Sequence, residues 1–448
     1  MTSQTQTKTG LKREVKWYVP VSLVVGTLGS TGIFGLIPAT YEMAGPGAAL
    51  VWVITLLWGF VIAMLLAYNF TIWPDKTGAE YAPVRIALGK VAGVIAGWGF
   101  FISWGTSGAV AGLILARYVF GAGAPPIHSQ LFTFALLTIF FALNMFGIKI
   151  AGLAQTALAV LKVVPLVIVG LAALPLINPA NFSPLWIPGI EGVNVSDPIG
   201  VFNLFMATAL IATWSTYATD IFASIASEVV DPQKSIPRAG AVASITSLVY
   251  IALIAFGAVG VVGEGLAQLP RPLFILGERA LGSAGTMLLW IALFFGALGV
   301  VNTALLSGAR ILYQMAVEGD LPSIFARVNK YNIPWINLTI IYIINVLMLF
   351  YTPLYVILVA IVQVPWMITW FLIGLANIKI RMTPKWHQTA AFKAPWWLII
   401  LGFIVSVLSL YFIYSYGVLY GWSDIQLGFG FVVFVLIILG INELTKRK

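Results

Sequence analysis

About twelve long apolar segments follow one another along this chain, and they constrain its fold more than any other feature. They lie near residues 18–43, 46–73, 91–120, 129–148, 151–176, 199–227, 239–262, 284–316, 335–352, 353–378, 396–418 and 425–442. A helix needs about 20 apolar residues to cross a bilayer, so each segment is a candidate span. Only 9% of the 448 residues are charged, too few to cover a soluble core of this size. The sequence therefore predicts an all-α, polytopic membrane protein with about 12 transmembrane helices.

The residue content argues against enzymes, cofactors and metals. The chain has no cysteine, which excludes disulfides and thiolate metal sites. Two histidines, His128 and His387, are too few for a histidine-built metal site. No HExxH motif and no paired acids occur within the apolar segments. We expect no enzymatic activity, no cofactor and no bound metal.

The lysines and arginines fall mostly on alternate connections between the spans. If the N-terminus is cytoplasmic and there are twelve spans, cytoplasmic segments hold 20 of these residues and outer segments hold 3, namely Arg117, Arg271 and Arg279. Basic residues concentrate in cytoplasmic loops of membrane proteins, which also explains the net charge of +9 without a nucleic-acid partner. The first run continues directly into further spans, so we expect no cleaved signal peptide. The pattern predicts a multi-pass cell-membrane protein with both termini cytoplasmic.

A polar patch interrupts the first apolar run near its centre. The stretch "GSTGIFGLIP" brings Gly29, Ser30, Thr31 and Gly32 together and ends at Pro38. Glycines in membrane helices often serve packing, and that alternative stays open for the pair alone. The hydroxyls and the proline favour an interrupted helix, which a membrane protein tolerates only where the break lines a cavity. The N-terminus of the half-helix after the break would suit a carboxylate.

The sixth run, 199–227, carries a second polar patch, "TWSTYATD". Its hydroxyls could simply bond back to their own helix. Asp220 differs, because an ionisable group inside a span is a functional candidate. Runs one and six lie five spans apart, which fits a 5+5 inverted repeat with broken helices 1 and 6. The predicted parts are an N-terminal tail 1–17, repeats 18–176 and 199–378, two further helices within 396–442, and a tail 443–448.

Lys162 is the third anomaly. It lies eleven residues into the fifth run, roughly 17 Å along a helix that rises about 1.5 Å per residue. Its stem cannot easily reach the surface over that distance, so we expect it to face the interior and contact an acid or several carbonyls. The alternative is a different span boundary, which would place Lys162 nearer the surface.

Four stretches resemble the motifs of the amino acid–polyamine–organocation (APC) transporters. They are "GSTGIFGLIP" in the first helix, "DKTGAEYAPVRIALG" after the second, "TWSTYATDIFASIASEVVDPQKSIPRA" in and after the sixth, and "NTALLSGARILYQMAVEGDLPSIFARVN" in and after the eighth. They occur in the family's order between about residues 20 and 380. The chain departs from the family's pattern at Ser30, Ala218 and Ser227, which bears on substrate preference more than on fold.

The resemblance implies alternating access and an amino acid bound between helices one and six. The implied substrate-binding residues are Gly29, Ser30, Thr31, Gly32, Ile33, Trp214, Ser215, Tyr217 and Ala218, with Trp214 as the gate. Lys162 matches a helix-five lysine whose ammonium resembles a stand-in for sodium, with Gly26 and Asn302 or Thr303 as its expected contacts. The implied coupling residues are Lys162, Asp220, Asn302 and Thr303.

The sequence thus predicts a secondary transporter of amino acids in the lipid bilayer, independent of sodium. Proton coupling, exchange and uniport remain open. The main alternative is a cationic amino acid or polyamine exchanger, which Asp220 motivates. A non-transporting receptor or a channel with the same helix count is the remote alternative, because fold alone does not settle function.

Overall fold

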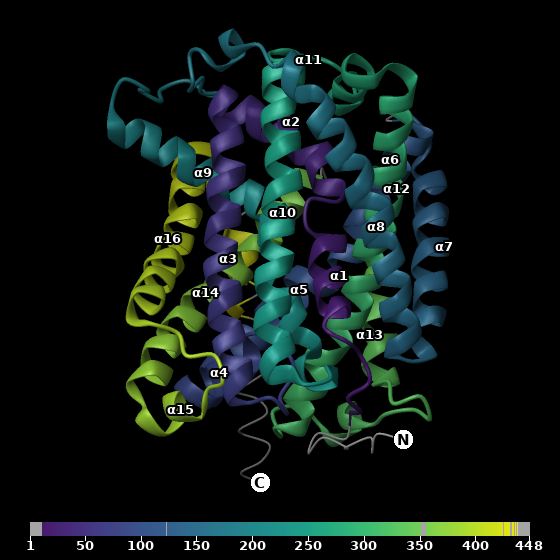
Figure 1. Ribbon diagram of the computed structural model, residues 1–448, viewed down its shortest axis with the longest axis vertical. Helices are drawn as coiled ribbons and strands as arrows, with labels where there is room; N and C mark the ends of the chain where they lie inside the picture. The colour runs from purple at the N-terminus through teal and green to yellow at the C-terminus, as the bar shows by residue number, and fades with distance from the viewer. Residues whose placement is uncertain are drawn as a thin grey trace.

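The computed structural model of the protein describes residues 11–121, 123–350, 355–423, 425–430, 432, 433, 435 and 437, the side chains of 355–361 excepted. Its helices stand side by side along the long axis of the molecule (Figure 1). Helices α4 (Tyr81–Leu88) and α15 (Pro384–Thr389) lie at one end, and α11 (Gly265–Gln268) lies at the other. We refer to these as the α4 end and the α11 end.

The first half of the chain forms helices at nearly all the predicted positions. In order they are α1 (Tyr18–Thr27), α2 (Thr31–Ala44), η1 (Gly45–Gly47), α3 (Ala48–Ile72), α4, α5 (Lys90–Gly105), α6 (Ser107–Phe120), α7 (Pro126–Met145) and α8 (Ile148–Ala173). The predicted run 91–120 differs, because it divides at Thr106 into α5 and α6. The Thr106 hydroxyl bonds back to the Ile102 carbonyl at 2.5 Å, a contact that bends a helix.

The second half follows the same plan after a connecting segment. In order come η2 (Leu174–Leu176), η3 (Pro179–Phe182), α9 (Pro198–Thr216), η4 (Ala218–Glu228), α10 (Pro232–Val262), α11, α12 (Pro272–Val317), η5 (Ser323–Ala326), α13 (Trp335–Met348), α14 (Tyr355–Met382), α15 and α16 (Trp396–Tyr420). Helix α12 is kinked at Leu281 and Gly282, so its apolar part begins close to the predicted residue 284. The predicted turn at 351–353, residues 431, 434, 436 and 438–442 of the run 425–442, and the tails 1–10 and 443–448 lie outside the described residues.

Eight helical segments of the described chain are long and apolar enough to cross a membrane. Apart from one isolated bridge between Val15 and Val229, the described residues contain no β-structure. Apolar side chains also cover the outside of the bundle: Leu153 on α8 is 66% exposed and Leu131 on α7 is 59% exposed. Lipid is the solvent that suits such surfaces. The protein is an all-helical, polytopic membrane protein.

The interior of the bundle surrounds the interrupted first span. Helix α8 packs against both α1 and α12, and η4 packs against α1, α3, α10 and α12. Two short helical pieces therefore lie among long ones: Figure 1 shows α1 near the centre of the molecule and α2 between it and the α11 end. That arrangement places the break away from lipid, where its free backbone groups can find partners.

Candidate functional site

The polar patch of the first span breaks the helix, as predicted. Helix α1 ends at Thr27, Leu28 turns to ψ 133°, and Gly29 takes a φ of +60°, a conformation that favours glycine. The Gly29 N–H donates to the Ser215 carbonyl at 2.9 Å, which ties the break to α9. The interruption covers residues 28–30, whereas Thr31 and Gly32 already belong to the first turn of α2.

The sixth span changes its helical form at the second polar patch. Helix α9 ends at Thr216, Tyr217 caps it, and the chain continues as a 3₁₀-helix through η4. A 3₁₀-helix has a tighter turn and poorer hydrogen-bond geometry than an α-helix. A neighbouring helix provides a hydrogen-bond partner for one polar group of this segment: the Thr219 hydroxyl donates to the Gly59 carbonyl of α3 at 2.8 Å. The span is therefore interrupted even though Ala218 stands where the resemblance places a glycine.

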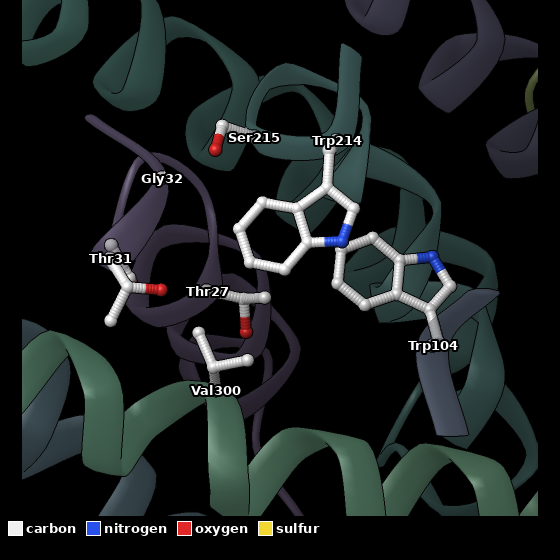
Figure 2. A pocket seen from close by; sticks show the side chains of 8 residues that line it. Thr27, Thr31, Gly32, Trp104, Trp214, Ser215 and Val300 are labelled. Atoms are coloured by element: carbon white, nitrogen blue, oxygen red, sulfur yellow. The ribbon is translucent and has the colours of Figure 1, made fainter. Parts of the chain in front are cut away.

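A pocket lies where the two interruptions meet (Figure 2). The space in which the centre of a water-sized sphere can move is about 10 Å³, so in this conformation the pocket has room for about one water molecule. Its lining comes from five helices, α1, α2, α5, α9 and α12, and from the break between α1 and α2, and consists of Thr27, Ser30, Thr31, Gly32, Trp104, Trp214, Ser215 and Val300. Figure 2 shows the indole rings of Trp214 and Trp104 side by side, with Thr27, Thr31 and Val300 across the space from Trp214.

The pocket contains some of the predicted residues and adds others. Ser30, Thr31, Gly32, Trp214 and Ser215 line it. The other predicted binding residues, Gly29, Ile33, Tyr217 and Ala218, are not part of the lining. Three lining residues were missed, namely Thr27, Trp104 and Val300. Thr27 is the last residue of α1, two positions before Gly29, whereas Trp104 on α5 and Val300 on α12 lie far along the chain from both polar patches and nothing in the sequence links them to the site.

Four polar atoms around this pocket are buried without a hydrogen-bond partner in the structure. They are the hydroxyls of Thr27, Thr31 and Ser215 and the indole N–H of Trp104. An unpaired buried polar group costs about 1–3 kcal/mol, so native proteins rarely leave one, and four in one pocket indicate a site for a polar molecule. None of the lining residues carries a charged side chain.

Gly32 sets how closely the two spans approach. A Cβ atom at this position would lie 1.4 Å from the Ser215 Oγ and 3.3 Å from the Trp214 ring. Any side chain here would displace Ser215 or fill the pocket. Gly32 is therefore required by close approach, whereas Gly29 is required by its backbone conformation.

Lys162 is fully buried on α8, which confirms that it faces the interior. Its Nζ atom donates to the carbonyls of Val25 and Leu28, both at 2.5 Å. Longer contacts reach the Ser30 hydroxyl at 3.3 Å and the Tyr250 hydroxyl at 3.2 Å. The ammonium thus binds carbonyls that the end of α1 leaves free. The sequence predicted either an acid or several carbonyls as its partners, and the structure shows carbonyls.

The individual contacts expected for Lys162 are wrong. The Gly26 carbonyl accepts from the Ser30 hydroxyl at 2.8 Å instead. Asn302 turns away from Lys162, donates to the Ala151 carbonyl and to Gln155, and accepts from Asn144. The Thr303 hydroxyl is buried and has no hydrogen bond to Lys162 or to any other described residue. The break turns the Val25 and Leu28 carbonyls toward α8, and the direction of that turn could not be predicted from local sequence.

Asp220 is buried in η4 and does not line the pocket. Its Oδ2 atom accepts from the Trp366 indole N–H at 3.2 Å. The carboxyl of Glu80, from the loop between α3 and α4, lies within hydrogen-bonding reach. Glu80 is fully buried and was missed, because its sequence position lies between spans rather than within one.

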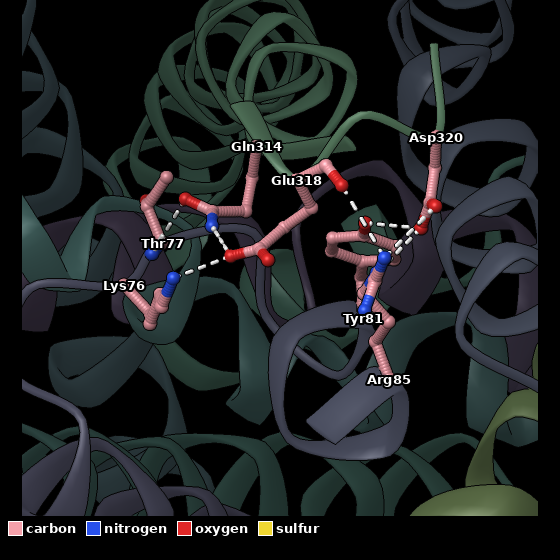
Figure 3. Close-up of polar contacts among 7 residues, drawn as sticks. All are labelled: Lys76, Thr77, Tyr81, Arg85, Gln314, Glu318 and Asp320. Atoms are coloured by element: carbon pink, nitrogen blue, oxygen red, sulfur yellow. Dashed lines mark hydrogen bonds and ion pairs between the residues drawn. The ribbon is translucent and has the colours of Figure 1, made fainter. Parts of the chain in front are cut away.

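Charged residues form a dense network at the α4 end (Figure 3). Lys76 binds Glu318, and Gln314 donates to the same carboxylate at 3.0 Å. Asp320 accepts from Arg85 Nε at 2.7 Å and from the Tyr81 hydroxyl at 2.6 Å. The hydrogen bond to Asp320 raises the pKa of Arg85, so this guanidinium stays charged. The network ties the loop before α4 to the end of α12.

The chain before α1 adds a second connection at this end. The N–H groups of Glu14 and Val15 donate to the Glu228 carbonyl at 2.9 and 3.1 Å. The Glu228 side chain in turn holds the buried Arg310, with Nε to Oε1 at 2.5 Å. Arg13 binds Asp75 at 2.6 Å. These contacts tie the chain before α1 to the end of η4 and to the loop after α3.

Among the described residues, no three histidine, aspartate or glutamate side chains are arranged to hold a metal ion. The comparisons with known proteins match this architecture. A model of the family described as amino acid permease matches residues 20–441. The chain belongs to the amino acid permease family.

Several permeases and transporters are similar to it at modest identity. The L-asparagine permease of Escherichia coli (strain K12) is 27% identical over 416 residues, covering 87% of this chain and 81% of that protein. The branched-chain amino acid permease BcaP of Lactococcus lactis subsp. cremoris is 25% identical over 458 residues, covering 96% and 94%. The polyamine transporter RMV1 of Arabidopsis thaliana is 27% identical over 326 residues, covering 69% and 62%. The family to which this chain belongs agrees with the resemblance found in its sequence.

Proposed function

We propose that this permease is a secondary transporter that moves neutral amino acids across the cell membrane by alternating access, and that it is not an enzyme. Two interrupted spans, five apart in the predicted order, support a 5+5 inverted repeat of residues 18–176 and 199–378 within about 12 spans. The α4 end would be cytoplasmic, together with both termini. The helices within 396–442 would stand outside the repeat.

The unpartnered polar atoms of the pocket carry this proposal. A bound amino acid offers a carboxylate to the Thr31 hydroxyl and to the free N–H groups at the start of α2. Its ammonium can be held by the Ser215 hydroxyl and by carbonyls at the end of α9. Each buried group would then exchange an unmet hydrogen bond for a charge-assisted one. Trp214, on the pocket wall, would close over the substrate as a gate.

The lining favours a neutral side chain on the substrate. An ammonium or guanidinium side chain would need an acid in the pocket, and none of the eight lining residues is charged. Asp220 motivated the cationic alternative, yet it stands outside the lining. A cationic amino acid or polyamine exchanger remains the second candidate, because one relative is named a polyamine transporter.

The contacts of Lys162 support transport without sodium. Its ammonium binds the carbonyls of Val25 and Leu28, as a cation would at the end of a broken helix. An ammonium at that place would make a bound sodium ion redundant. Lys162 would then bias the balance between conformations rather than bind a co-transported ion.

Uptake into proteoliposomes tests the function and its substrate class together. We expect protein-dependent uptake of labelled neutral amino acids such as valine or asparagine, equal in sodium and choline buffers. Lysine and putrescine should compete poorly. Strict dependence on sodium, or stronger competition by putrescine than by neutral amino acids, would contradict this assignment. Thermal stabilisation by amino acids without any uptake would indicate a receptor.

A further inference from the structure

Two buried carboxyl groups face one another between the pocket and the α4 end. Glu80 precedes α4 and Asp220 lies in η4, six residues after Trp214, and both are 0% exposed. The two carboxyls are within hydrogen-bonding reach of each other. The chain separates them by 140 residues, so they form a pair only in the folded protein.

The hydrogen bonds of this pair are incomplete. Asp220 Oδ2 accepts from the Trp366 indole, whereas Asp220 Oδ1 and both carboxyl oxygens of Glu80 lack a hydrogen bond of good geometry. The Trp370 indole and the Glu80 backbone N–H lie near enough to give weaker contacts to Asp220 and Glu80, respectively. Two ionised carboxylates can only accept hydrogen bonds, so neither could provide a hydrogen-bond donor to the oxygens of the other. A single proton between them supplies the missing donor.

Cations on the neighbouring elements are bound to other groups. On α4, Arg85 forms an ion pair with Asp320, and on α12, Arg310 forms one with Glu228. On α10, Arg238 stacks on the Trp17 ring, and Lys234 lies 3.8 Å from Asp231. Helices α1 and α3 carry no charged residue.

The remaining ionisable groups on these elements are not partners for the pair. On α14, the side facing Asp220 presents Trp366, while Lys379 and Arg381 stand in the last turn. Glu318 on α12 binds Lys76, and Tyr81 on α4 donates to Asp320. Tyr217 stacks on Trp370, with ring centroids 3.8 Å apart. Two negative charges in this setting would repel without compensation.

Burial raises the pKa of Glu80, which lies in the loop outside the spans, to about 7. A raised carboxyl pKa means that the folded protein holds the proton below that pH and loses it above. The proton would therefore be exchanged within the physiological range.

We propose that Glu80 and Asp220 share one proton and that this proton accompanies the substrate. The coupling role rests on the transport function proposed above, whereas the shared proton does not. Thr77, three residues before Glu80, donates its hydroxyl to the Ser224 carbonyl of η4 and its N–H to Gln314 at 3.3 Å. Opening of the α4 end breaks these contacts and admits water, which accepts the proton as the substrate leaves.

Infrared spectroscopy of the purified protein in lipid tests the proton directly. In the wild type, the signal of a protonated carboxyl should disappear as the pH rises through about 7. Glu80→Gln and Asp220→Asn should each abolish this titration, because an amide replaces the proton as the donor between the two groups. Glu191→Gln, at an exposed loop position, is the matched control and should leave it unchanged. A wild type without the signal, or a signal that survives both substitutions, would overturn the proposal.

Transport assays test the coupling separately. With one proton per substrate, a difference of one pH unit should drive about tenfold accumulation in the wild type. Glu80→Gln should abolish that accumulation and still exchange labelled for unlabelled substrate. Accumulation equal to the wild type in Glu80→Gln would refute the coupling role. Absence of exchange in the wild type would instead refute the transport function, and the infrared titration would still decide whether the proton is shared.

Discussion

The central pocket and the α4 end use polar groups in opposite ways. Around the pocket, the polar atoms of Thr27, Thr31, Ser215 and Trp104 are buried without partners, and no lining side chain is charged. At the α4 end, charged side chains are numerous and paired, from Arg85 with Asp320 to Arg310 with Glu228. Unmet hydrogen bonds mark a place kept for a ligand, and satisfied ones mark a contact that holds the protein shut. The comparison contrasts a central pocket whose polar groups are free to bind a ligand with an end of the bundle that ion pairs hold together.

Gly32→Ala should have the largest effect, because it removes the space on which the pocket depends. The new Cβ would lie 1.4 Å from Ser215 Oγ, so Ser215 or the α2 backbone must shift. A displacement of that size can cost about a hundredfold in activity, and we expect uptake near the protein-free background. Gly123→Ala, where a Cβ meets nothing within 4 Å, is the control. Wild-type uptake by Gly32→Ala would show that the pocket is not the substrate site.

Lys162→Ala tests whether the end of α1 needs a cation. The carbonyls of Val25 and Leu28 would both lose the ammonium and keep only the Tyr250 hydroxyl, which lies 3.2 and 2.6 Å from them and can donate its one hydrogen to only one of the two. Each unpaired buried carbonyl costs about 1–3 kcal/mol, so uptake should fall roughly tenfold or more, with a lower melting temperature. Lys149→Ala, which removes a lysine 59% exposed on the same helix, should change neither quantity. Equal behaviour of the two variants would remove the argument for sodium independence.

Trp214→Ala sharpens the role of the pocket wall. Loss of the ring removes an aromatic contact with the substrate and admits water. Such a contact is worth about 1 kcal/mol, so the KM for uptake should rise up to about tenfold while the melting temperature stays close to the wild type. Trp214→Phe should recover most of the affinity. If Trp214→Ala transports with unchanged kinetics, the gate assignment is wrong.

Arg85→Lys addresses the α4 end and should have the smallest effect. It replaces a two-pronged contact with Asp320 by a single one, and the Arg85 side chain is 26% exposed. A partly solvated pair contributes about 0.2–1 kcal/mol, so the conformation open at this end should gain less than about fivefold in population. Because the chain has no cysteine, Ser224→Cys provides a single thiol beneath the network, and its labelling rate reports opening. A rate unchanged by Arg85→Lys would show that this pair does not hold the end closed.

Local features of the sequence were enough to predict the helices and the break. A glycine with a positive φ, two hydroxyls and a proline all act within a few residues, so their effect on the first span can be derived without knowing its neighbours. The division of 91–120 at Thr106 escaped prediction because one hydroxyl bonding to its own helix leaves no clear signal.

The site was predicted on the interrupted spans and missed elsewhere. Ser30, Thr31, Gly32, Trp214 and Ser215 could be proposed because their patches were visible in the sequence. Trp104 and Val300 look like ordinary apolar residues of α5 and α12, and only packing brings them to the pocket. Their role depends on which face of each helix turns inward, and nearly continuous apolar segments do not reveal that.

The sequence by itself determined the solvent and the order of the spans, because apolar length and the scarcity of charge are properties of the chain. It also placed Lys162 inside the bundle, since no lysine stem reaches the surface from that depth. The tertiary structure alone decided the partners. Lys162 found the carbonyls of Val25 and Leu28 rather than Asn302, and Glu80 came to face Asp220 across 140 residues of chain. Contacts between distant segments depend on the register and rotation of packed helices, which local composition does not encode.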